Sequence, residues 1–351
     1  RASRETPGVD SIVKVKATAP MPEPAELNAA ERLATLAFDD MRRVDALILD
    51  RLQSHVTLIP ELARYLIEAG GKRVRPMITI AAANMIGCRD EAPIKLAAAV
   101  EFIHTATLLH DDVVDESGMR RGKAAANLVW GNASSVLVGD FLFARSFSLM
   151  VEAGSMKALG VLSAAASTIA EGEVRQLAAV KDTGVSVETY LEIIDAKTAA
   201  LFAAAAQVAG IVAARPIAEE KALETYGREL GLAFQLVDDA LDYDGAAAKL
   251  GKSVGDDFRE GKVTLPVALS ILSATDEQRA FWDRVIGHLD QRDGDFDTAL
   301  AYMREHKAIE ATIEAAHNRA AKARQALSIF PANEWRLALE ALASFVVTRA
   351  H

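Results

Sequence analysis

Two stretches of this chain have the residue types and spacing to bind metal ions. Asp111–Asp115 and Asp238–Asp242 both read Asp-Asp-x-x-Asp, and each follows a helix-patterned apolar stretch and precedes a glycine, Gly118 or Gly245. On a helix, residues i and i+4 share a face and residue i+1 is turned by about 100°, so each stretch groups three carboxylates. The negative end of a helix dipole disfavours such anions unless cations hold them, and Mg²⁺ prefers oxygen ligands. One copy would indicate a solvated acidic helix end, whereas two copies favour metal binding.

A set of basic residues could bind phosphate groups beside these carboxylates. Its members are Lys72, Arg73, Arg75, Arg120, Arg121, Lys197, Lys252 and Lys262. Arg offers phosphate a two-pronged donor and Lys a point charge, although any one of them alone is more often a solvated surface cation. Lys197 differs because apolar residues flank it, and a buried lysine needs a partner. Carboxylates that hold metals, with cations around them, predict a site for diphosphate groups, since Mg²⁺ bridges the two sets of oxygens.

Composition excludes several classes of protein. The 351 residues are 51% hydrophobic, enough for a large core, and the net charge of −10 argues against a nucleic-acid partner. The single Cys88 excludes an intramolecular disulfide framework and a multi-cysteine zinc site, and it fits a cytoplasmic protein. The longest apolar stretch, residues 199–214, is interrupted by Gln207 and is shorter than the about 20 residues of a membrane span. We therefore expect a buried helix there and no dedicated membrane helix.

Helical spacing of apolar residues runs through most of the chain. Met41, Val44, Ile48 and Leu52 form one face of an amphipathic helix. Further helices are predicted up to Gly87, from Pro93 to the first aspartate stretch, and over 132–152, 156–179, 187–213, 218–242, 264–273 and 298–350, the last divided near Pro331.

One segment departs from the helical pattern. Tyr243–Lys262 is rich in glycine and charge, which predicts a mobile loop between two helices. Without a repeat or a linker, the sequence predicts one all-α domain over residues 25–351, a bundle of roughly ten or more helices. Residues 1–24 are polar and Pro-rich, so we expect them to form a flexible tail.

The motifs in this order resemble the trans-isoprenyl diphosphate synthase family, the head-to-tail polyprenyl synthases, and in particular its long-chain octaprenyl and decaprenyl type. The similarity runs from about residue 65 to residue 270. Its pieces are Gly-Lys-Arg-Val-Arg-Pro at 71–76, Asp111–Asp115 with Arg-Arg-Gly at 120–122, Trp-Gly-Asn at 130–132, Gly-Asp-Phe-Leu at 139–142, Gly172-Glu173 with Gln176-Leu177, Lys197-Thr198, Phe234–Asp242 and 251–266. A single Asp-Asp-x-x-Asp is weak, but this ordered set is specific. The resemblance implies a helical bundle around a central cavity.

The resemblance also implies three Mg²⁺ ions per active site. Asp111 and Asp115, with Asp112 in support, would hold two ions on an allylic diphosphate. Asp238, with Asp239 and Asp242 near it, would hold the third from the facing helix.

Two diphosphate subsites are implied in the same way. Arg120, Lys197, Lys252 and Lys262 would bind the allylic diphosphate, with Thr198 and Gln235 beside the reacting allyl group. Lys72, Arg75, His104 and Arg121 would bind isopentenyl diphosphate. By its spacing alone, His104 is more often a satisfied core histidine, and the resemblance is what favours the binding role.

The mechanism that this arrangement implies follows from charge. The diphosphate leaves as a polyanion, which Mg²⁺, Arg and Lys neutralise, and the allylic cation needs a dry, apolar pocket. The alkene of isopentenyl diphosphate attacks, and the departing diphosphate takes the proton, since no residue of the sequence indicates a general base. The Tyr243–Lys262 loop is placed to close over the site.

Product length depends on the helix before Asp111. The residues four and five positions earlier, Thr107 and Ala106, are small, whereas short-chain members of the family typically place an aromatic stopper at this level. From Pro93 to Asp111 the helix offers about 27 Å of wall, which suits about eight to ten isoprene units (about C40–C50), the length of a respiratory ubiquinone side chain. Phe102, or Phe141 and Phe143, could form the floor.

Other functions remain open at this stage. A class I terpene cyclase usually carries a different second motif and lacks a second diphosphate site. Phytoene and squalene synthases space their acids differently, and a regulatory subunit of a heteromeric synthase usually loses an aspartate motif. A shorter C15–C20 product is the alternative within the family. The family implies a homodimer, and an apolar product implies peripheral membrane contact.

Overall fold

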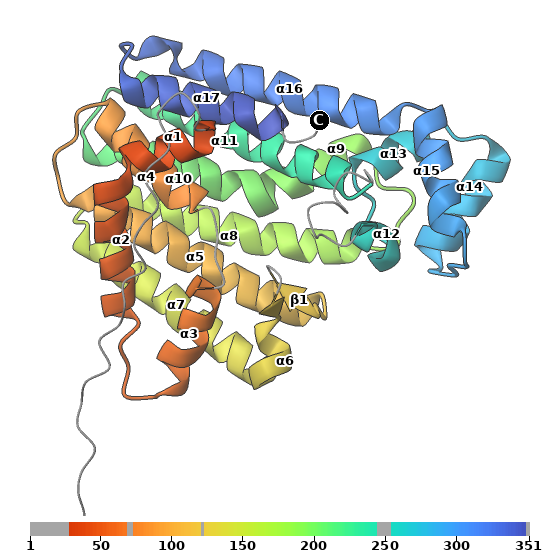
Figure 1. Cartoon of the computed structure of the whole chain (residues 1–351), viewed down its shortest axis with the longest axis horizontal. Helices are drawn as coiled ribbons and strands as arrows, with labels where there is room; N and C mark the ends of the chain where they lie inside the picture. Colours follow the sequence, from red (N-terminus) through yellow and green to blue (C-terminus); the bar gives the residue numbers. More distant parts are fainter. Residues whose placement is uncertain (1–27, 69–72, 121–122, 244–253, 349–351) are drawn as a thin grey trace, which may run out of the picture.

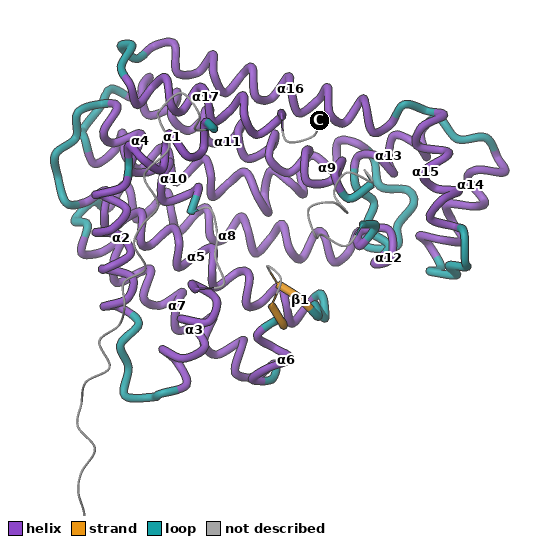
Figure 2. Tube along the Cα trace, in the orientation of Figure 1, coloured by secondary structure: helices purple, strands orange, loops and turns teal. Residues whose placement is uncertain are grey.

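The computed structural model describes residues 28–68, 73–120, 123–243 and 254–348, so the expected tail lies outside its described part. The helices are α1 (Ala29–Leu36), α2 (Phe38–Arg51), α3 (Leu58–Glu68), α4 (Val74–Met85), α5 (Ala92–Val114), α6 (Ala126–Trp130), α7 (Asn132–Glu152), α8 (Met156–Ala179), α9 (Val187–Ile194), α10 (Ala200–Val212), α11 (Ile217–Leu241), α12 (Asp256–Glu260), α13 (Leu265–Leu272), α14 (Asp276–Trp282), α15 (Asp295–Glu305), α16 (Ala308–Ala326) and α17 (Glu334–Thr348). Two short strands, β1 (Met119–Arg120) and β2 (Lys123–Ala124), form a hairpin after α5. The predicted all-α fold is confirmed (Figures 1 and 2).

The centre of the bundle is α10, which packs against α4, α5, α8 and α11. Its sequence is apolar on all sides, and nearly every residue of Ala200–Ile211 is buried, as in a helix surrounded by other helices. The long helices α5, α8 and α11 run roughly side by side around it, and α16 and α17 cover α11 (Figure 1). The predicted buried helix at 199–214 is therefore confirmed.

Each aspartate stretch lies at the C-terminal end of a long helix. Helix α5 has a proline in its first turn, as predicted, and has Asp115 as its C-cap, while α11 has Asp242 as its C-cap. In each case the first two aspartates lie in the last turn of the helix and the third ends it.

The segment Tyr243–Lys262 is more ordered than the loop we expected, because residues 256–260 form the short helix α12. Asp242 fixes its start: its backbone oxygen accepts from the amide of Gly255, and its carboxylate accepts from the amides of Asp256 and Asp257 at 3.2 and 3.0 Å. The expectation of a loop was wrong for residues 256–260, while residues 244–253 lie outside the described part.

By length and composition alone, three described helical stretches could cross a membrane: Ala92–Val114, Asn132–Glu152 and Val187–Val212. In the first and third, 78% of the most apolar window is buried inside the fold, so both are core helices. In Asn132–Glu152, which is α7, only 39% is buried. This helix therefore presents an apolar face that nothing in the described chain covers.

Candidate active site

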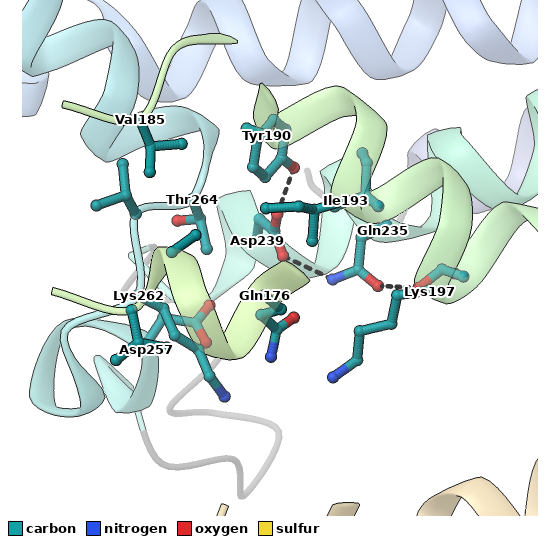
Figure 3. Close-up of a pocket in the computed structure, with 15 residues that line it drawn as sticks. Gln176, Val185, Tyr190, Ile193, Lys197, Gln235, Asp239, Asp257, Lys262 and Thr264 are labelled. Carbon is teal, nitrogen blue, oxygen red and sulfur yellow. Dashed lines mark hydrogen bonds between the residues drawn. The ribbon is translucent and has the colours of Figure 1, made fainter. Parts of the chain in front are cut away.

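A cavity of about 140 Å³ lies where α8, α9, α11 and the segment after α12 meet (Figure 3). Its apolar wall comes from residues such as Val185, Ile193 and Val263. Its polar lining is Gln176, Tyr190, Lys197, Thr198, Gln235, Asp239, Asp257, Lys262 and Thr264. Four residues of the predicted site, Lys197, Thr198, Gln235 and Asp239, therefore share one cavity with the predicted phosphate ligand Lys262.

Two lysines connect this cavity to the first aspartate stretch. The Lys197 ammonium lies 3.8 Å from Oδ2 of Asp111, and the Lys262 ammonium lies 3.5 Å from Oδ2 of Asp115. Burial raises the pKa of the Asp111 carboxyl from its usual value to about 7, although Lys197 opposes the rise. The ionised form of Asp111 is therefore costly unless a cation lies beside it.

Asp112 has a different role from its two neighbours. Its side chain is fully buried, and Oδ1 accepts hydrogen bonds from Nε and Nη2 of Arg120. Asn127 donates to the backbone oxygen of Asp112 at 3.1 Å. Asp112 thus fixes Arg120 at the β-hairpin, and its supporting role in metal binding stays a prediction.

Lys197 is positioned by an irregular turn of helix. Residues Asp195–Ala199 form a π-helical turn, η1, between α9 and α10, a feature that often marks functional sites. A side chain on Gly172 of α8 would meet Cβ of Ala196 at 2.8 Å, so only glycine lets the two helices approach this closely. Glu173 then reaches Lys197, with Oε2 accepting from the ammonium at 2.9 Å. Lys197 is half-buried, and the nearer of its two carboxylate partners is Glu173.

Thr198 and Gln235 belong to a chain of hydrogen bonds that continues to Tyr190. The Thr198 hydroxyl donates to Oε1 of Gln235 at 2.9 Å, and Nε2 of Gln235 donates to Oδ1 of Asp239 at 2.7 Å. The Tyr190 hydroxyl donates to the other carboxylate oxygen, Oδ2 (Figure 3). Both oxygens of Asp239 therefore accept hydrogen bonds from side chains of the protein.

The second aspartate stretch is part of a buried acidic cluster. Burial raises the pKa of Asp239 and Asp242, and it also raises the pKa of Asp257, which lines the same cavity. The neighbouring carboxylates add to the rise because like charges repel. Asp238 stands beside this cluster on α11. A site that crowds acids in this way favours the arrival of cations.

The predicted isopentenyl diphosphate subsite is only partly described. Nη1 of Arg75 lies 3.2 Å from Nε2 of His104, and the Arg75 guanidinium lies over the ring of Phe202 at 4.3 Å. The structure thus brings these two predicted ligands together. The neighbouring Arg73 instead donates to Glu101 at 2.8 Å. Lys72, Arg121 and Lys252 lie outside the described residues.

The chain-length residues lie on α5 before Asp111. Ala106 is fully buried, and Thr107 is half-buried, with its hydroxyl donating to the backbone oxygen of His104 at 2.8 Å. The two small side chains leave this level of α5 without an aromatic ring, as the sequence predicted.

Several site residues had no role in the sequence prediction, among them Tyr190, Asp257 and Glu173. Glu173 lay within a quoted motif, and Tyr190 stands two helical turns before Lys197, a spacing that could have indicated a shared face. Asp257 stood in a stretch that we interpreted as a loop. No pattern in the sequence pairs it with Asp239, because that contact depends on Asp242 fixing the start of α12.

The donor set can be compared with the preferences of Mg²⁺. Within the described residues, no three His, Cys, Asp or Glu side chains are close enough to enclose a metal ion. Mg²⁺ is usually bound by one or two carboxylates together with substrate phosphates and water, not by a cage of protein ligands. Buried carboxylates such as Asp111, beside lysines that can bind phosphate, fit an ion that arrives with its substrate.

Comparison with known proteins gives a consistent result. The model of the Polyprenyl synthetase family matches residues 56–303. Octaprenyl diphosphate synthase of Escherichia coli (strain K12) is 48% identical over 321 residues, which cover 91% of this chain and 98% of that protein.

Solved structures agree with this result. The crystal structure of a decaprenyl diphosphate synthase from Rhodobacter capsulatus has a TM-score of 0.89 and 51% identity, over 92% of this chain and 99% of that one. The crystal structure of a polyprenyl synthase from Caulobacter crescentus CB15, complexed with calcium and isoprenyl diphosphate, has a TM-score of 0.88 and 55% identity. The match covers 93% of this chain and 100% of that one.

Proposed function

Because this chain belongs to the polyprenyl synthetase family and is a prenyltransferase, we propose that it condenses isopentenyl diphosphate head-to-tail onto an allylic diphosphate to give a long-chain, all-trans polyprenyl diphosphate. One observation carries the proposal. Lys197 and Lys262 reach from a cavity with apolar walls to Asp111 and Asp115, so carboxylates and phosphate-binding cations meet beside space for a hydrocarbon.

The residues that would hold Mg²⁺ are Asp111 and Asp115 on α5 and Asp238 on α11. We assign Asp239 and Asp242 to supporting roles, because Asp239 accepts from Gln235 and Tyr190 and Asp242 caps α12. When bound, the Mg²⁺ ions, three per site, would neutralise the negative charge that develops on the leaving diphosphate.

The chain's own residues would orient the substrates. The allylic diphosphate is bound by charge, through Lys197, Lys262, Arg120 and Lys252. Glu173 holds Lys197 in place, and Asp112 holds Arg120. Arg75 and His104, with Lys72 and Arg121, bind the second diphosphate. The Thr198 hydroxyl donates its hydrogen bond to Gln235, so its oxygen lone pairs remain free to face an electron-poor allylic carbon.

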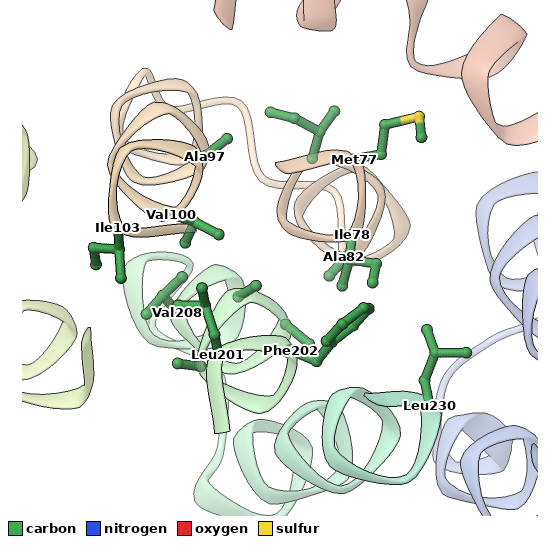
Figure 4. Close-up of a cluster of buried hydrophobic side chains, with 14 of the residues drawn as sticks. Met77, Ile78, Ala82, Ala97, Val100, Ile103, Leu201, Phe202, Val208 and Leu230 are labelled. Carbon is green, nitrogen blue, oxygen red and sulfur yellow. The ribbon is translucent and has the colours of Figure 1, made fainter. Parts of the chain in front are cut away.

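Product length follows from the wall below Asp111. Thr107, Ile103 and Val100 share the face of α5 that carries Asp111. Val100 and Ile103 point toward Leu201 and Val208 of α10, so the wall there is entirely apolar (Figure 4). Phe102 lies on the opposite face, which leaves Phe141 and Phe143 of α7 as the candidates for a floor. Relatives named octaprenyl and decaprenyl synthases support a product of that range, suited to a ubiquinone side chain.

We further propose a homodimer that forms through α7. Leu137 and Val151 on this helix are 67% and 65% exposed, and the small Ala144 and Ser148 lie on the same exposed face. This face also carries the exposed Asp140, but its other members are apolar or small, which favours an interface. Light scattering after gel filtration should give twice the chain mass, and Leu137→Glu should give monomers. A monomeric wild-type protein would refute the dimer.

The place of action is a proposal of its own. We propose a cytoplasmic enzyme that contacts the membrane only peripherally, when its apolar product leaves. Cell fractionation tests this: the protein should remain with the soluble fraction or leave the membrane with high salt. Extraction that requires detergent would contradict it.

The enzyme assay combines purified protein, Mg²⁺, labelled isopentenyl diphosphate and farnesyl or geranylgeranyl diphosphate, with products separated by length. We expect a ladder that ends at octaprenyl to decaprenyl. A product of C15–C20 would keep the reaction and overturn the length, while no elongation with any primer would support a regulatory subunit.

A further inference from the structure

Tyr190 is a buried residue at the site to which no role has been assigned. It lies on α9, is 3% exposed, and contributes to the wall of the cavity. Its hydroxyl donates to Oδ2 of Asp239, the oxygen that Gln235 does not use. The contact joins α9 to α11 across the end of the cavity (Figure 3).

A second contact joins the same two elements. Thr198 follows α9 in the π-helical turn η1, and its hydroxyl donates to Gln235 on α11 at 2.9 Å. Gln235 and Asp239 are one turn apart on α11 and are themselves linked at 2.7 Å. Tyr190 and Thr198 thus hold two successive turns of α11 through one continuous chain of hydrogen bonds.

The structure gives each hydrogen bond in this series a direction. When Asp239 is ionised its carboxylate only accepts, so Gln235 turns its NH₂ group toward Asp239 and its oxygen toward Thr198. Thr198 must then donate to that oxygen. The orientation of the Thr198 hydroxyl therefore depends on Asp239 remaining in place. The two side chains are linked in this series of hydrogen bonds only through Gln235.

The close packing of the helices leaves little tolerance for movement. A side chain on Gly231, one turn before Gln235, would lie 2.8 Å from Cα of Ala199, next to Thr198. The backbones are this close here, and the conformation of Gln235 that reaches Thr198 is the one that also places its NH₂ group on Asp239. Asp239 selects that conformation, and Tyr190 determines how the carboxylate of Asp239 is turned.

We infer that Tyr190 is a positioning residue for the prenyl transfer, which acts through Asp239 and Gln235 to aim the Thr198 hydroxyl at the reacting allylic carbon. The inference rests on the proposed function. Without the Tyr190 hydroxyl, Oδ2 of Asp239 lacks its donor, the carboxylate can rotate, and Gln235 and Thr198 lose their fixed orientation. Substrate binding by the lysines and arginines is unaffected, so the loss falls on turnover.

Tyr190→Phe tests the inference, and the chain offers a matched control. Tyr226 is also fully buried, and its hydroxyl donates to the backbone oxygen of Leu339 at 2.8 Å, in a hydrogen bond outside the cavity. Tyr226→Phe therefore removes one buried hydrogen bond of the same residue type without touching the site. Both variants should lower the melting temperature by similar amounts, since each leaves one acceptor without its donor.

Only Tyr190→Phe should change the kinetics. With farnesyl diphosphate, isopentenyl diphosphate and Mg²⁺, we expect kcat to fall about tenfold, which is about 1.4 kcal/mol of barrier, while both KM values stay within about twofold. Tyr226→Phe should keep the wild-type kcat. An unchanged kcat in Tyr190→Phe, or an equal loss in both variants, would overturn the inference.

A double-mutant cycle tests whether Tyr190 acts through Asp239. Asp239→Ala removes the acceptor, so adding Tyr190→Phe to it should lower kcat by no more than about twofold further. Fully multiplicative losses would mean that Tyr190 does not act through Asp239. Inactive wild-type protein would refute the proposed function instead, which separates the two failures.

Discussion

The ammonium of Lys262, which follows the second aspartate stretch, lies 3.5 Å from Oδ2 of Asp115 in the first. It also contacts Oε2 of Glu260 at 2.5 Å. Burial opposes the charge on Lys262, but Glu260 and Asp115 outweigh it and raise the pKa of this lysine, which therefore stays charged. One cation thus links the two halves of the site before any substrate is bound.

Lys262→Gln should weaken the first substrate step. The amide keeps the length and polarity but loses the charge that faces the allylic diphosphate, so we expect kcat/KM for the allylic substrate to fall about 10- to 100-fold. KM for isopentenyl diphosphate should change little. Steady-state assays with each substrate varied in turn will show this.

The control for this variant is Lys322→Gln, on an exposed position of α16 away from the cavity. It should behave as wild type. Equal effects on both substrates in Lys262→Gln would contradict the assignment to the allylic subsite.

Mg²⁺ should stabilise the protein more at pH 8 than at pH 6. Burial raises the folded-state pKa of Asp111 to about 7, above its unfolded value, so without metal its ionisation costs stability as the pH rises from about 4 to 7. The cation binds the ionised carboxylate, and its stabilising effect grows over the same range. With saturating Mg²⁺ we expect the melting temperature to rise by about 3–6 °C at pH 8 and by clearly less at pH 6.

Asp111→Asn checks the origin of that effect. The amide cannot ligate Mg²⁺ as an anion, so the pH-dependent part of the thermal shift should disappear and kcat/KM should fall about 10²- to 10³-fold. Asp39→Asn, on the exposed face of α2, serves as the control. A thermal shift that is the same at both pH values in the wild-type protein would show that Asp111 is not a ligand.

The sequence predicted the parts of this molecule that follow from periodicity. The buried helix at 199–214, the proline in the first turn of α5 and the break at Pro331 all appear in the structure. Spacing on single helices also placed Asp111 with Asp115.

Contacts between distant helices could not be predicted in this way. The hydrogen bond between Tyr190 and Asp239 joins residues 49 apart, and the contact of Lys262 with Asp115 spans even more of the chain. Such contacts depend on how closely the helices approach, which Gly172 and Gly231 determine only once the partner helix is known. Helix α12 was missed because its start depends on hydrogen bonds to Asp242.

Arg75→Lys should affect isopentenyl diphosphate alone. The guanidinium of Arg75 is held between His104 and the ring of Phe202, an arrangement that a lysine cannot reproduce because it lacks the planar fork. We expect KM for isopentenyl diphosphate to rise about tenfold, with KM for the allylic substrate unchanged. Arg89→Lys, an exposed site near the start of α5, is the conservative control.

Thr107→Phe should shorten the product. Thr107 is half-buried on the face of α5 that carries Asp111, so an aromatic ring there would stand in the path of the growing chain. Ala106→Phe should act in the same direction, but Ala106 is fully buried, and overpacking there should cost about 1–3 kcal/mol of stability. Thr107→Phe is therefore the cleaner variant, and Thr107→Ser, which keeps the small polar side chain, is its matched control.

The product ladder gives the result directly. Thr107→Ser should still end at octaprenyl to decaprenyl, whereas Thr107→Phe should end several units earlier, with the rate of the first condensation close to that of wild type. The first condensation is preserved because the ring lies one turn below Asp111, beyond the diphosphate and the reacting carbon. A Thr107→Phe enzyme that makes the full-length product would show that the chain does not pass along this face of α5.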